Sequence, residues 1–302
     1  MGSLKFLFLK LILFSVILII LDYAVGSTLE SLYFSKRSLS NENNKLNYSL
    51  NQANEDLLIF GSSTAYHGYI PKIFEDSLKM SCYNVGQNLM DIYFHYALLN
   101  SILQRYTPRI IILDLTAWDF VKSNDDFEIL SDLYPFYYSN VSVKEVVDLP
   151  GNCEKVKMLS KIYRYNSKML FILKNNIIKS NEGEKGYIPL YARWTDKIAI
   201  DTSGVFLTDA FKFSYLDKFI DNACDKGSKL IIIASPSFCI FTKNQYLELE
   251  KYLDKKGVTF WNYRNDTTFI NHQEYYYNVT HLNNSGAEKF TKIIASRLKS
   301  QL

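Results

Sequence analysis

The sequence predicts an α/β fold: a doubly wound parallel sheet, with an N-terminal transmembrane helix before it and an insertion within it. Short apolar runs such as residues 56–61 and 109–115 lack alternating polar residues, which is typical of strands covered on both faces. Segments of helical length separate these runs, and this alternation favours parallel pairing. Because ligands bind at the carboxyl ends of the strands in such sheets, we expect chemistry in the loops that follow them.

Five strands and five helices account for most of the chain after its apolar start. The strands are expected at residues 56–61, 82–86, 109–115, 229–234 and 258–261. The helices are expected at residues 71–78, 91–106, 208–226, 243–256 and 285–298. Residues from about 117 to 205 break this alternation, because they are rich in Tyr and Asn with a helical patch near 154–178. We interpret them as an insertion or lid.

The N-terminal segment is long and apolar enough to cross a membrane. Residues 6–25 read FLFLKLILFSVILIILDYAV, and about 20 helical residues match a hydrocarbon core of roughly 30 Å. We predict an anchor at residues 1–27, a polar stalk at 28–54 and an α/β domain at 55–302. A cleaved signal peptide is the alternative, because residues 24–27, Ala-Val-Gly-Ser, are small residues near a cleavage point. The short stretch before the helix favours a single-pass protein of the cell membrane with its C-terminal domain outside the cytoplasm.

Composition argues against some classes of function. The formal net charge of +3 is small and spread along the chain, without the basic stripe of a nucleic-acid-binding protein. No cluster of His, Asp, Glu or Cys has the spacing of a metal site, so no metal and no other cofactor is expected. The cysteines lie far apart and are expected to be buried apolar residues, although one disulfide outside the cytoplasm stays open: Cys82, Cys153, Cys224 and Cys239.

Two segments carry residues that are suited to chemistry. Residues 61–64, Gly-Ser-Ser-Thr, follow the first predicted strand. A serine hydroxyl there is exposed, and neighbouring backbone N–H groups are free to hold an oxyanion. Residues 278–281, Asn-Val-Thr-His, lie just before the C-terminal helix, where the imidazole can reach the end of the first strand.

These two segments, with Gly86 between them, resemble the SGNH (GDSL-type) hydrolase superfamily, which has a flavodoxin-like fold. The resemblance spans most of residues 55–116 and 205–300. It implies that Ser63 is the nucleophile and that His281 is the general base.

The same resemblance implies an oxyanion hole formed by the N–H groups of Ser63 and Gly86, with the Asn88 side chain as a further donor. The chain also resembles the membrane-anchored branch of the superfamily, which includes the D-alanine transfer and alginate O-acetylation proteins. An anchored domain of that branch acts beside a multi-spanning membrane acyltransferase, which is therefore an expected partner.

Two positions depart from the pattern of the superfamily. Ser62 stands where the first block usually has Asp, and Asn278 stands where the triad Asp is expected. An amide oxygen can orient the imidazole but cannot stabilise an imidazolium with a full charge. This implies a weak catalyst, a Ser-His dyad, or a carboxylate from elsewhere, the candidates being Asp114, Asp119 and Asp266.

Each candidate residue also has a plainer interpretation. A Gly-Ser-Ser stretch alone is often a turn, and a histidine before a helix often bonds only to backbone. Gly86 can be required simply by a turn. His67 is a rival base four residues from Ser63, although lining the cleft is the more common role, and His95 and His272 have no predicted partner.

The predicted function is that of an exported, membrane-anchored serine esterase or O-acyltransferase. Its substrate would be an acylated cell-envelope or surface glycan, or a small ester, with acetyl as the acyl group. The alternative is a catalytically degenerate domain that binds glycan or scaffolds a membrane acyltransferase. A lipase-like esterase is less favoured, because nothing marks an acyl-chain tunnel.

The sequence contains N-glycosylation sequons at Asn47, Asn140, Asn265, Asn278 and Asn283. Glycans beside His281 would obstruct the cleft, so we expect a bacterial host that leaves these sequons unmodified.

Overall fold

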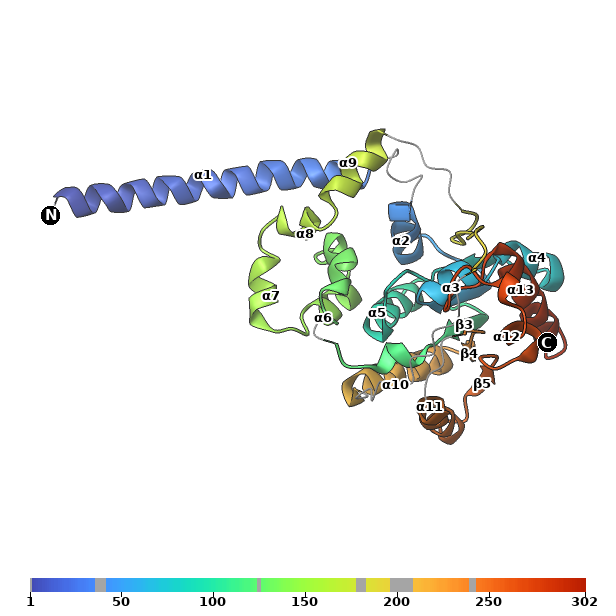
Figure 1. The fold of residues 1–302 in the computed structure, drawn as a ribbon. Coiled ribbons are helices and arrows are strands. Elements are labelled where there is room, and N and C mark those ends of the chain that lie inside the picture. Colours follow the sequence, from blue (N-terminus) through green and yellow to red (C-terminus); the bar gives the residue numbers. More distant parts are fainter. Residues whose placement is uncertain (1, 36–41, 124–125, 178–182, 196–208, 239–242) are drawn as a thin grey trace. The chain divides into compact units, whose positions relative to one another are not determined.

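The chain forms two compact units (Figure 1). The computed structural model describes residues 2–35, 42–123, 126–177, 183–195, 209–238 and 243–302. Unit 1 comprises residues 1–44 and 130–181, and unit 2 comprises residues 45–129 and 182–302. All the candidate site residues belong to unit 2.

The elements of secondary structure described in unit 1 are all helices. Its helices are α1 (Gly2–Tyr33), most of η3 (Ile129–Phe136), α6 (Val141–Val147), α7 (Asn152–Lys157), α8 (Tyr163–Asn166) and α9 (Met169–Ile177). The last third of α1 packs within this unit, because Leu29 and Tyr33 are buried and the Tyr33 ring contacts Phe136 and Tyr165. The first two thirds of α1 are apolar and exposed. This helix is long and apolar enough to span a membrane, a property that signal sequences share.

Unit 2 is built on a five-stranded parallel sheet of strand order β2-β1-β3-β4-β5. The strands are β1 (Leu57–Gly61), β2 (Cys82–Asn84), β3 (Ile110–Asp114), β4 (Lys229–Ala234) and β5 (Thr259–Asn262). The strand order reverses between β1 and β3. The crevice outside the carboxyl ends of these two strands is therefore the topological switch point, where ligands bind in sheets of this kind.

Helices cover both faces of the sheet. They are α2 (Glu42–Asn51), which starts at the end of unit 1, α3 (Ser63–Gly68), α4 (Pro71–Leu78), α5 (Ile92–Leu103), η2 (Ala117–Phe120), α10 (Ala210–Asp225), α11 (Lys243–Lys255), α12 (Thr267–Ile270), η4 (Gln273–Tyr275) and α13 (Asn284–Lys299). On one face α5 packs against α10, and Phe60 of β1 meets Phe219 of α10 with their ring centroids 5.4 Å apart. On the other face α13 packs against α3 and α4.

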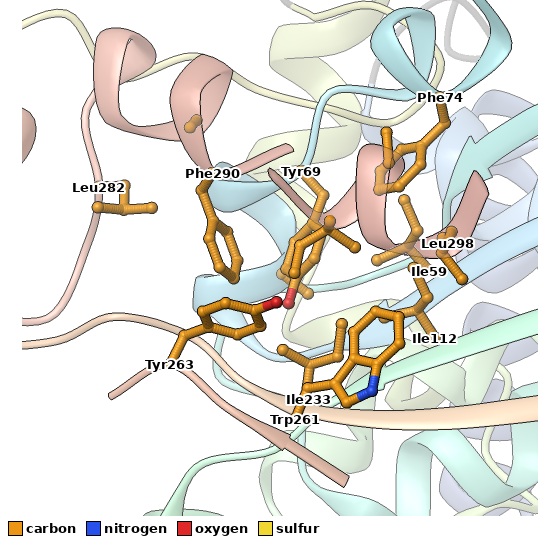
Figure 2. Close-up of a cluster of buried hydrophobic side chains, with 14 of the residues drawn as sticks. Ile59, Tyr69, Phe74, Ile112, Ile233, Trp261, Tyr263, Leu282, Phe290 and Leu298 are labelled. Atoms are coloured by element: carbon orange, nitrogen blue, oxygen red, sulfur yellow. The ribbon is translucent and has the colours of Figure 1, made fainter. Parts of the chain in front are cut away.

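The core below α13 explains why the strands read as continuous apolar runs. Successive side chains of a strand point to opposite faces, so each strand of a doubly covered sheet needs apolar residues on both. Figure 2 shows one of these faces, where Ile59, Ile112 and Ile233 from three adjacent strands lie beneath Phe290 and Leu298 of α13. All five side chains are buried.

The predicted fold class is confirmed, since all five strands occur where the apolar runs lie and form one parallel sheet. Four predicted helices match α4, α5, α11 and α13 to within a few residues. The fifth corresponds to α10, although position 208 lies outside the described residues. The loop expected directly after β1 is instead the short helix α3, which had no apolar periodicity of its own to reveal it.

The domain limits at residues 27 and 54 remain a prediction, but a helix crosses the first limit and the predicted stalk contains a second helix. Helix α1 continues to Tyr33, and α2 lies within the predicted stalk and buries Leu46 and Leu50. The helical patch predicted near 154–178 is three short helices, and the predicted insertion is shared between the two units.

The expectation that the cysteines are buried is wrong for Cys153 and Cys224, which are exposed and free. Cys153 lies on the short polar helix α7, and Cys224 lies on the solvent-facing side of the amphipathic helix α10. Cys82 is buried and free, as expected for an apolar residue. Cys239 lies outside the described residues.

Phe290 tests the packing of α13 on the sheet. Phe290→Ala is expected to lower the free energy of unfolding by about 3–5 kcal/mol, because the substitution removes a fully buried ring and leaves a cavity. Denaturant unfolding of the detergent-solubilised protein measures this change. Lys292→Ala, at an exposed position of the same helix, is the control and should stay within about 0.5 kcal/mol. A loss below about 1 kcal/mol for Phe290→Ala would contradict this packing.

Candidate active site

The turn between β1 and α3 places Ser63 at the switch point. Gly61 ends β1 with a φ of 140°, a conformation that side-chain-bearing residues rarely adopt. A Cβ on Gly61 would lie 2.6 Å from the Asp114 carbonyl oxygen and 2.8 Å from the Ala65 Cβ. The chain then enters α3 at Ser63, so the first N–H groups of the helix have no intrahelical partner.

Ser63 and His281 meet although they are 218 residues apart in the chain. The Nε2 atom of His281 lies 2.7 Å from the Ser63 hydroxyl oxygen. On the other side of the ring, Nδ1 lies 2.9 Å from the Asn278 amide oxygen and 2.9 Å from the Thr280 hydroxyl oxygen. The fold therefore joins the two sequence segments that were singled out as suited to chemistry.

Asn278 fixes the His281 ring through a tight turn. Its amide oxygen also accepts hydrogen bonds from the backbone N–H groups of Thr280 and His281, at 3.0 and 2.9 Å. An amide oxygen only accepts, so the partner that it favours is a protonated Nδ1. The neutral ring then keeps Nε2 unprotonated, and Nε2 can accept the proton of the Ser63 hydroxyl.

The surroundings of His281 favour its neutral form. Burial is the main cause and the nearby His67 the second, and together they lower the pKa of His281 to about 4. The His67 and His281 rings meet edge to face with their centroids 5.9 Å apart. In this state the His281 ring stays unprotonated throughout the neutral range.

No carboxylate within the described residues completes a triad with His281. Asp114 and Asp119 bond to other groups, and Asp266 caps α12 by accepting from the Thr268 N–H at 2.8 Å. Asp119 accepts from the backbone and hydroxyl of Thr116, and burial raises its pKa to about 7. Asp114, Asp119 and Asp266 were the candidates for a carboxylate partner of His281. None of them contacts the His281 ring in this structure, so that expectation is wrong.

Asp114 instead supports the turn that carries Ser63. Its fully buried carboxylate accepts hydrogen bonds from Thr64, at 2.7 Å, and from the hydroxyls of Tyr69 and Ser235. Burial raises the pKa of Asp114. Sequence reasoning missed this role; the signal for it was an acidic residue at the end of a wholly apolar strand, next in the sheet to β1.

Gly86 lies close to α3, and its N–H group is already bonded. A Cβ on Gly86 would lie 2.9 Å from the Ala65 Cβ, and the Gly86 N–H donates to the Asn84 amide oxygen at 3.0 Å. The Asn84 side chain also donates to the carbonyls of Ala65 and Tyr69. Buried Asn84 therefore ties β2 to α3, a second role that sequence reasoning missed.

Lys45 supports the same loop from α2. Its ammonium group donates to the Gly86 and Gly186 carbonyl oxygens and lies 3.9 Å from the centre of the Tyr66 ring. The side chain is buried. A single lysine in a polar segment carries no pattern, so nothing in the sequence indicated this contact.

The other predicted polar residues have identifiable surroundings. The Asn88 amide oxygen is buried without a hydrogen-bond partner in the described part of the chain. His67 Nδ1 lies 2.7 Å from the Ile188 carbonyl oxygen, and the partly exposed His272 contacts Glu274. His95 is buried in α5, and burial lowers its pKa to about 3.

A cleft of about 580 Å³ opens beside Ser63. Its lining combines the turn residues Ser62, Ser63 and Thr64 with the exposed, left-handed Leu89 and with Thr280. Charged groups form another part of the lining, where Lys212 lies 2.6 Å from Asp126 and 3.4 Å from Asp91. Burial raises the pKa of Asp91 to about 6. Within the described ranges, no three His, Cys, Asp or Glu side chains are grouped to hold a metal ion.

Comparison with known proteins gives little guidance. A protein-family model matches residues 165–302, which is less than half of the chain, and no curated protein matches. A solved structure of a candidate acylhydrolase from Bacteroides fragilis is similar at 8% sequence identity, with a TM-score of 0.45. That match covers 87% of this chain and 97% of the other. A likeness this distant carries no conclusion about activity.

The titration of His281 tests the description of its surroundings. We expect its resonances in histidine-labelled NMR spectra to titrate near pH 4, because burial disfavours the charged ring. The folded pKa lies below that of the unfolded chain, so this group contributes stability fully above about pH 6.5 and progressively less as the pH falls towards 4. The His281→Gln spectrum assigns the signal. A titration near pH 7 would contradict a ring that lacks a carboxylate partner.

Proposed function

We propose that this chain is a membrane-anchored serine esterase or O-acyltransferase of the SGNH type. The observation that carries the proposal is the 2.7 Å contact between the Ser63 hydroxyl oxygen and the His281 Nε2 atom, with Asn278 behind the ring. A nucleophile, a base and a residue that orients the base are the three parts of a hydrolytic serine site. They lie at the switch point of the sheet, next to a cleft.

In the proposed reaction Ser63 attacks the carbonyl carbon of an ester while His281 takes the hydroxyl proton at Nε2. The tetrahedral intermediate then expels the alcohol, which receives that proton from His281, and the acyl group stays on Ser63. Water or a sugar hydroxyl attacks the acyl-enzyme by the same route in reverse. Hydrolysis or acyl transfer results, depending on the acceptor.

The oxyanion of the intermediate needs donors at the start of α3. We propose the Ser63 N–H, which has no intrahelical partner, as the first donor. Gly86 is the second, and the Asn88 side chain the third. Because the Gly86 N–H is bonded to Asn84 in this structure, its part in the reaction requires the exchange of that oxygen for the oxyanion.

The cleft combines apolar surface with buried polar groups. Its lining includes Asp91, Asp119 and Lys212, which are buried, while exposed Leu89 offers an apolar surface to the face of a sugar ring or a short acyl group. We propose an O-acetylated glycan of the cell envelope or cell surface as the substrate. A multi-spanning acyltransferase in the same membrane is the proposed partner.

We propose that α1 is kept as the anchor and that unit 2 lies outside the cytoplasm. The Asp22 carboxylate accepts hydrogen bonds from the Ser160 hydroxyl and from the N–H groups of Lys161 and Ile162. Cleavage near residues 24–27 would remove Asp22 and with it these three bonds. Contacts of this kind support retention, because a signal peptide is absent from the mature protein.

The second candidate function is a binding or scaffolding domain without turnover. Asn278 favours it, because an amide cannot balance the charge of the imidazolium that forms during attack. In this case the Ser63–His281 pair would persist as structure, and the cleft would bind a glycan or a membrane acyltransferase.

A fluorophosphonate probe separates the two functions. We expect the probe to label Ser63, because the probe needs only an activated hydroxyl and an oxyanion site. Ser63→Ala should abolish labelling, and His281→Ala should slow it by at least about 100-fold. The readout is intact mass and peptide mapping of the full-length protein.

Ser62→Ala is the matched control, since Ser62 is the neighbouring serine and also lines the cleft. Labelling should persist in this variant. If the probe does not label the folded parent protein at all, the enzyme proposal is wrong and the binding-domain proposal remains.

Asn278→Asp tests how the missing charge limits the site. An aspartate at this position keeps the oxygen that faces Nδ1 and adds a negative charge, so the pKa of His281 should rise. The acid limb of activity on a p-nitrophenyl ester should move upward by more than about one pH unit, and kcat should rise by about tenfold or more. Asn283→Asp, at the N-cap of α13, is the control for a new charge nearby. An unchanged acid limb in Asn278→Asp would rule out Asn278 as the residue that sets the base.

A further inference from the structure

The apolar part of α1 ends at a definite point in unit 1. Every residue from Leu4 to Leu21 is exposed, and these 18 residues rise about 27 Å, close to the roughly 30 Å of a hydrocarbon core. Asp22 follows, and the next residue, Tyr23, is 66% exposed. An acidic residue and a tyrosine at the end of such a run mark the interface between lipid and water.

A second segment of unit 1 is fixed at this same level. Asp22 accepts from the Ser160 hydroxyl at 2.5 Å, from the Lys161 N–H at 2.7 Å and from the Ile162 N–H at 3.1 Å. Gly26, one turn along α1, lies so close to Lys161 that a Cβ there would come within 2.6 Å of it. Residues 160–162 are therefore held against α1 directly after its apolar, exposed run ends at Leu21.

The residues next to this tie are exposed and apolar. Leu159 precedes Ser160 and is 73% exposed, and Val156, less than a turn away, is 65% exposed. The Leu159 N–H donates to the Val156 carbonyl oxygen at 3.1 Å, so both residues belong to one turn at the end of α7. Two large aliphatic side chains therefore face outward from one turn, at the level where α1 leaves its apolar, exposed run.

The same turn is basic. Residues 152–168 contain Lys155, Lys157, Lys161, Arg164 and Lys168 but only one acidic residue, Glu154. Lys157 pairs with Glu154 and Lys161 pairs with Glu30, whereas the Lys155 side chain is exposed and has no partner among the residues that the structure describes. Exposed lysines beside apolar side chains match a surface of anionic headgroups over acyl chains.

We propose that Lys155, Val156, Lys157 and Leu159 form a membrane-contact surface, the α7 surface, that lies on anionic lipid headgroups beside α1. The two aliphatic side chains enter the headgroup region, and the two lysines lie at the level of the phosphates. With α1 this surface gives unit 1 a second contact with the bilayer, which limits rotation of the unit about the helix axis. The proposal rests on α1 spanning the membrane and not on the chemistry of Ser63.

Other exposed apolar residues of unit 1 provide a matched control. Ile177 of α9 is 82% exposed, but the neighbouring Asn176 donates to the Leu32 carbonyl oxygen at 3.1 Å. Leu32 is ten residues beyond Asp22, about 15 Å further along α1. Ile177 is therefore as exposed as Leu159 in the same unit, yet it lies away from the proposed lipid surface.

Depth-dependent quenching tests the proposal on the full-length protein. Leu159→Cys and Ile177→Cys each receive a small fluorophore, in a background where Cys153, Cys224 and Cys239 are serine and buried Cys82 is kept. The protein is reconstituted in phosphatidylcholine vesicles, with or without phosphatidylglycerol, that contain a headgroup-level nitroxide lipid. Intact mass of the reconstituted protein verifies that α1 is present.

The label at position 159 should be quenched at least about threefold more than the label at 177 in anionic vesicles, because an interfacial surface lies within about 5–10 Å of the quencher. Lys155→Glu combined with Lys157→Glu should reduce this excess to the level at 177. Equal quenching at the two positions overturns the α7 surface. If the label at 159 is quenched more than the label at 177, but to the same extent with and without phosphatidylglycerol and in the charge-reversed variant, the α7 surface does not recognise anionic headgroups.

Discussion

The hydrogen bond between Ser63 and His281 is the contact on which the proposed chemistry depends. It forms because two turns, one after β1 and one before α13, meet at one edge of the sheet. Gly61, in a backbone conformation that favours glycine, turns the chain sharply from β1 into α3 and presents Ser63 at the start of that helix. The Asn278 turn, just before α13, presents the imidazole. The packing of α13 on α3 and α4 holds the two together.

The amide at position 278 gives this pair an unusual electrostatic setting. A carboxylate would raise the pKa of the imidazole, whereas here burial lowers it to about 4. In the proposed reaction the base is available over a wide pH range but is weak, and the imidazolium formed during attack has only a dipole to stabilise it. Acidic groups are abundant nearby, yet Asp114 and Asp119 bond to hydroxyls and backbone and not to the ring. The proposed attack by Ser63 is therefore expected to be slow.

Much of this arrangement was predictable from the sequence. Apolar runs located all five strands, and the pairing of residues 61–64 with 278–281 located the candidate nucleophile and the candidate base, which the fold brings into contact. Contacts made by single polar side chains were not predictable: Asn84 bonded to Gly86, Asp114 bonded to Thr64, and Lys45 bonded to the Gly86 carbonyl oxygen. Each depends on which element the topology brings alongside, and one buried polar residue leaves no periodic signal.

The central claim is that Ser63 accepts an acyl group, and direct capture of that intermediate tests it most closely. Protein quenched in acid during turnover of p-nitrophenyl acetate should carry one acetyl group, and peptide mapping should place that group on Ser63. Rapidly quenched samples in which the ester is consumed, yet no acetyl group is ever found on Ser63, would contradict the account.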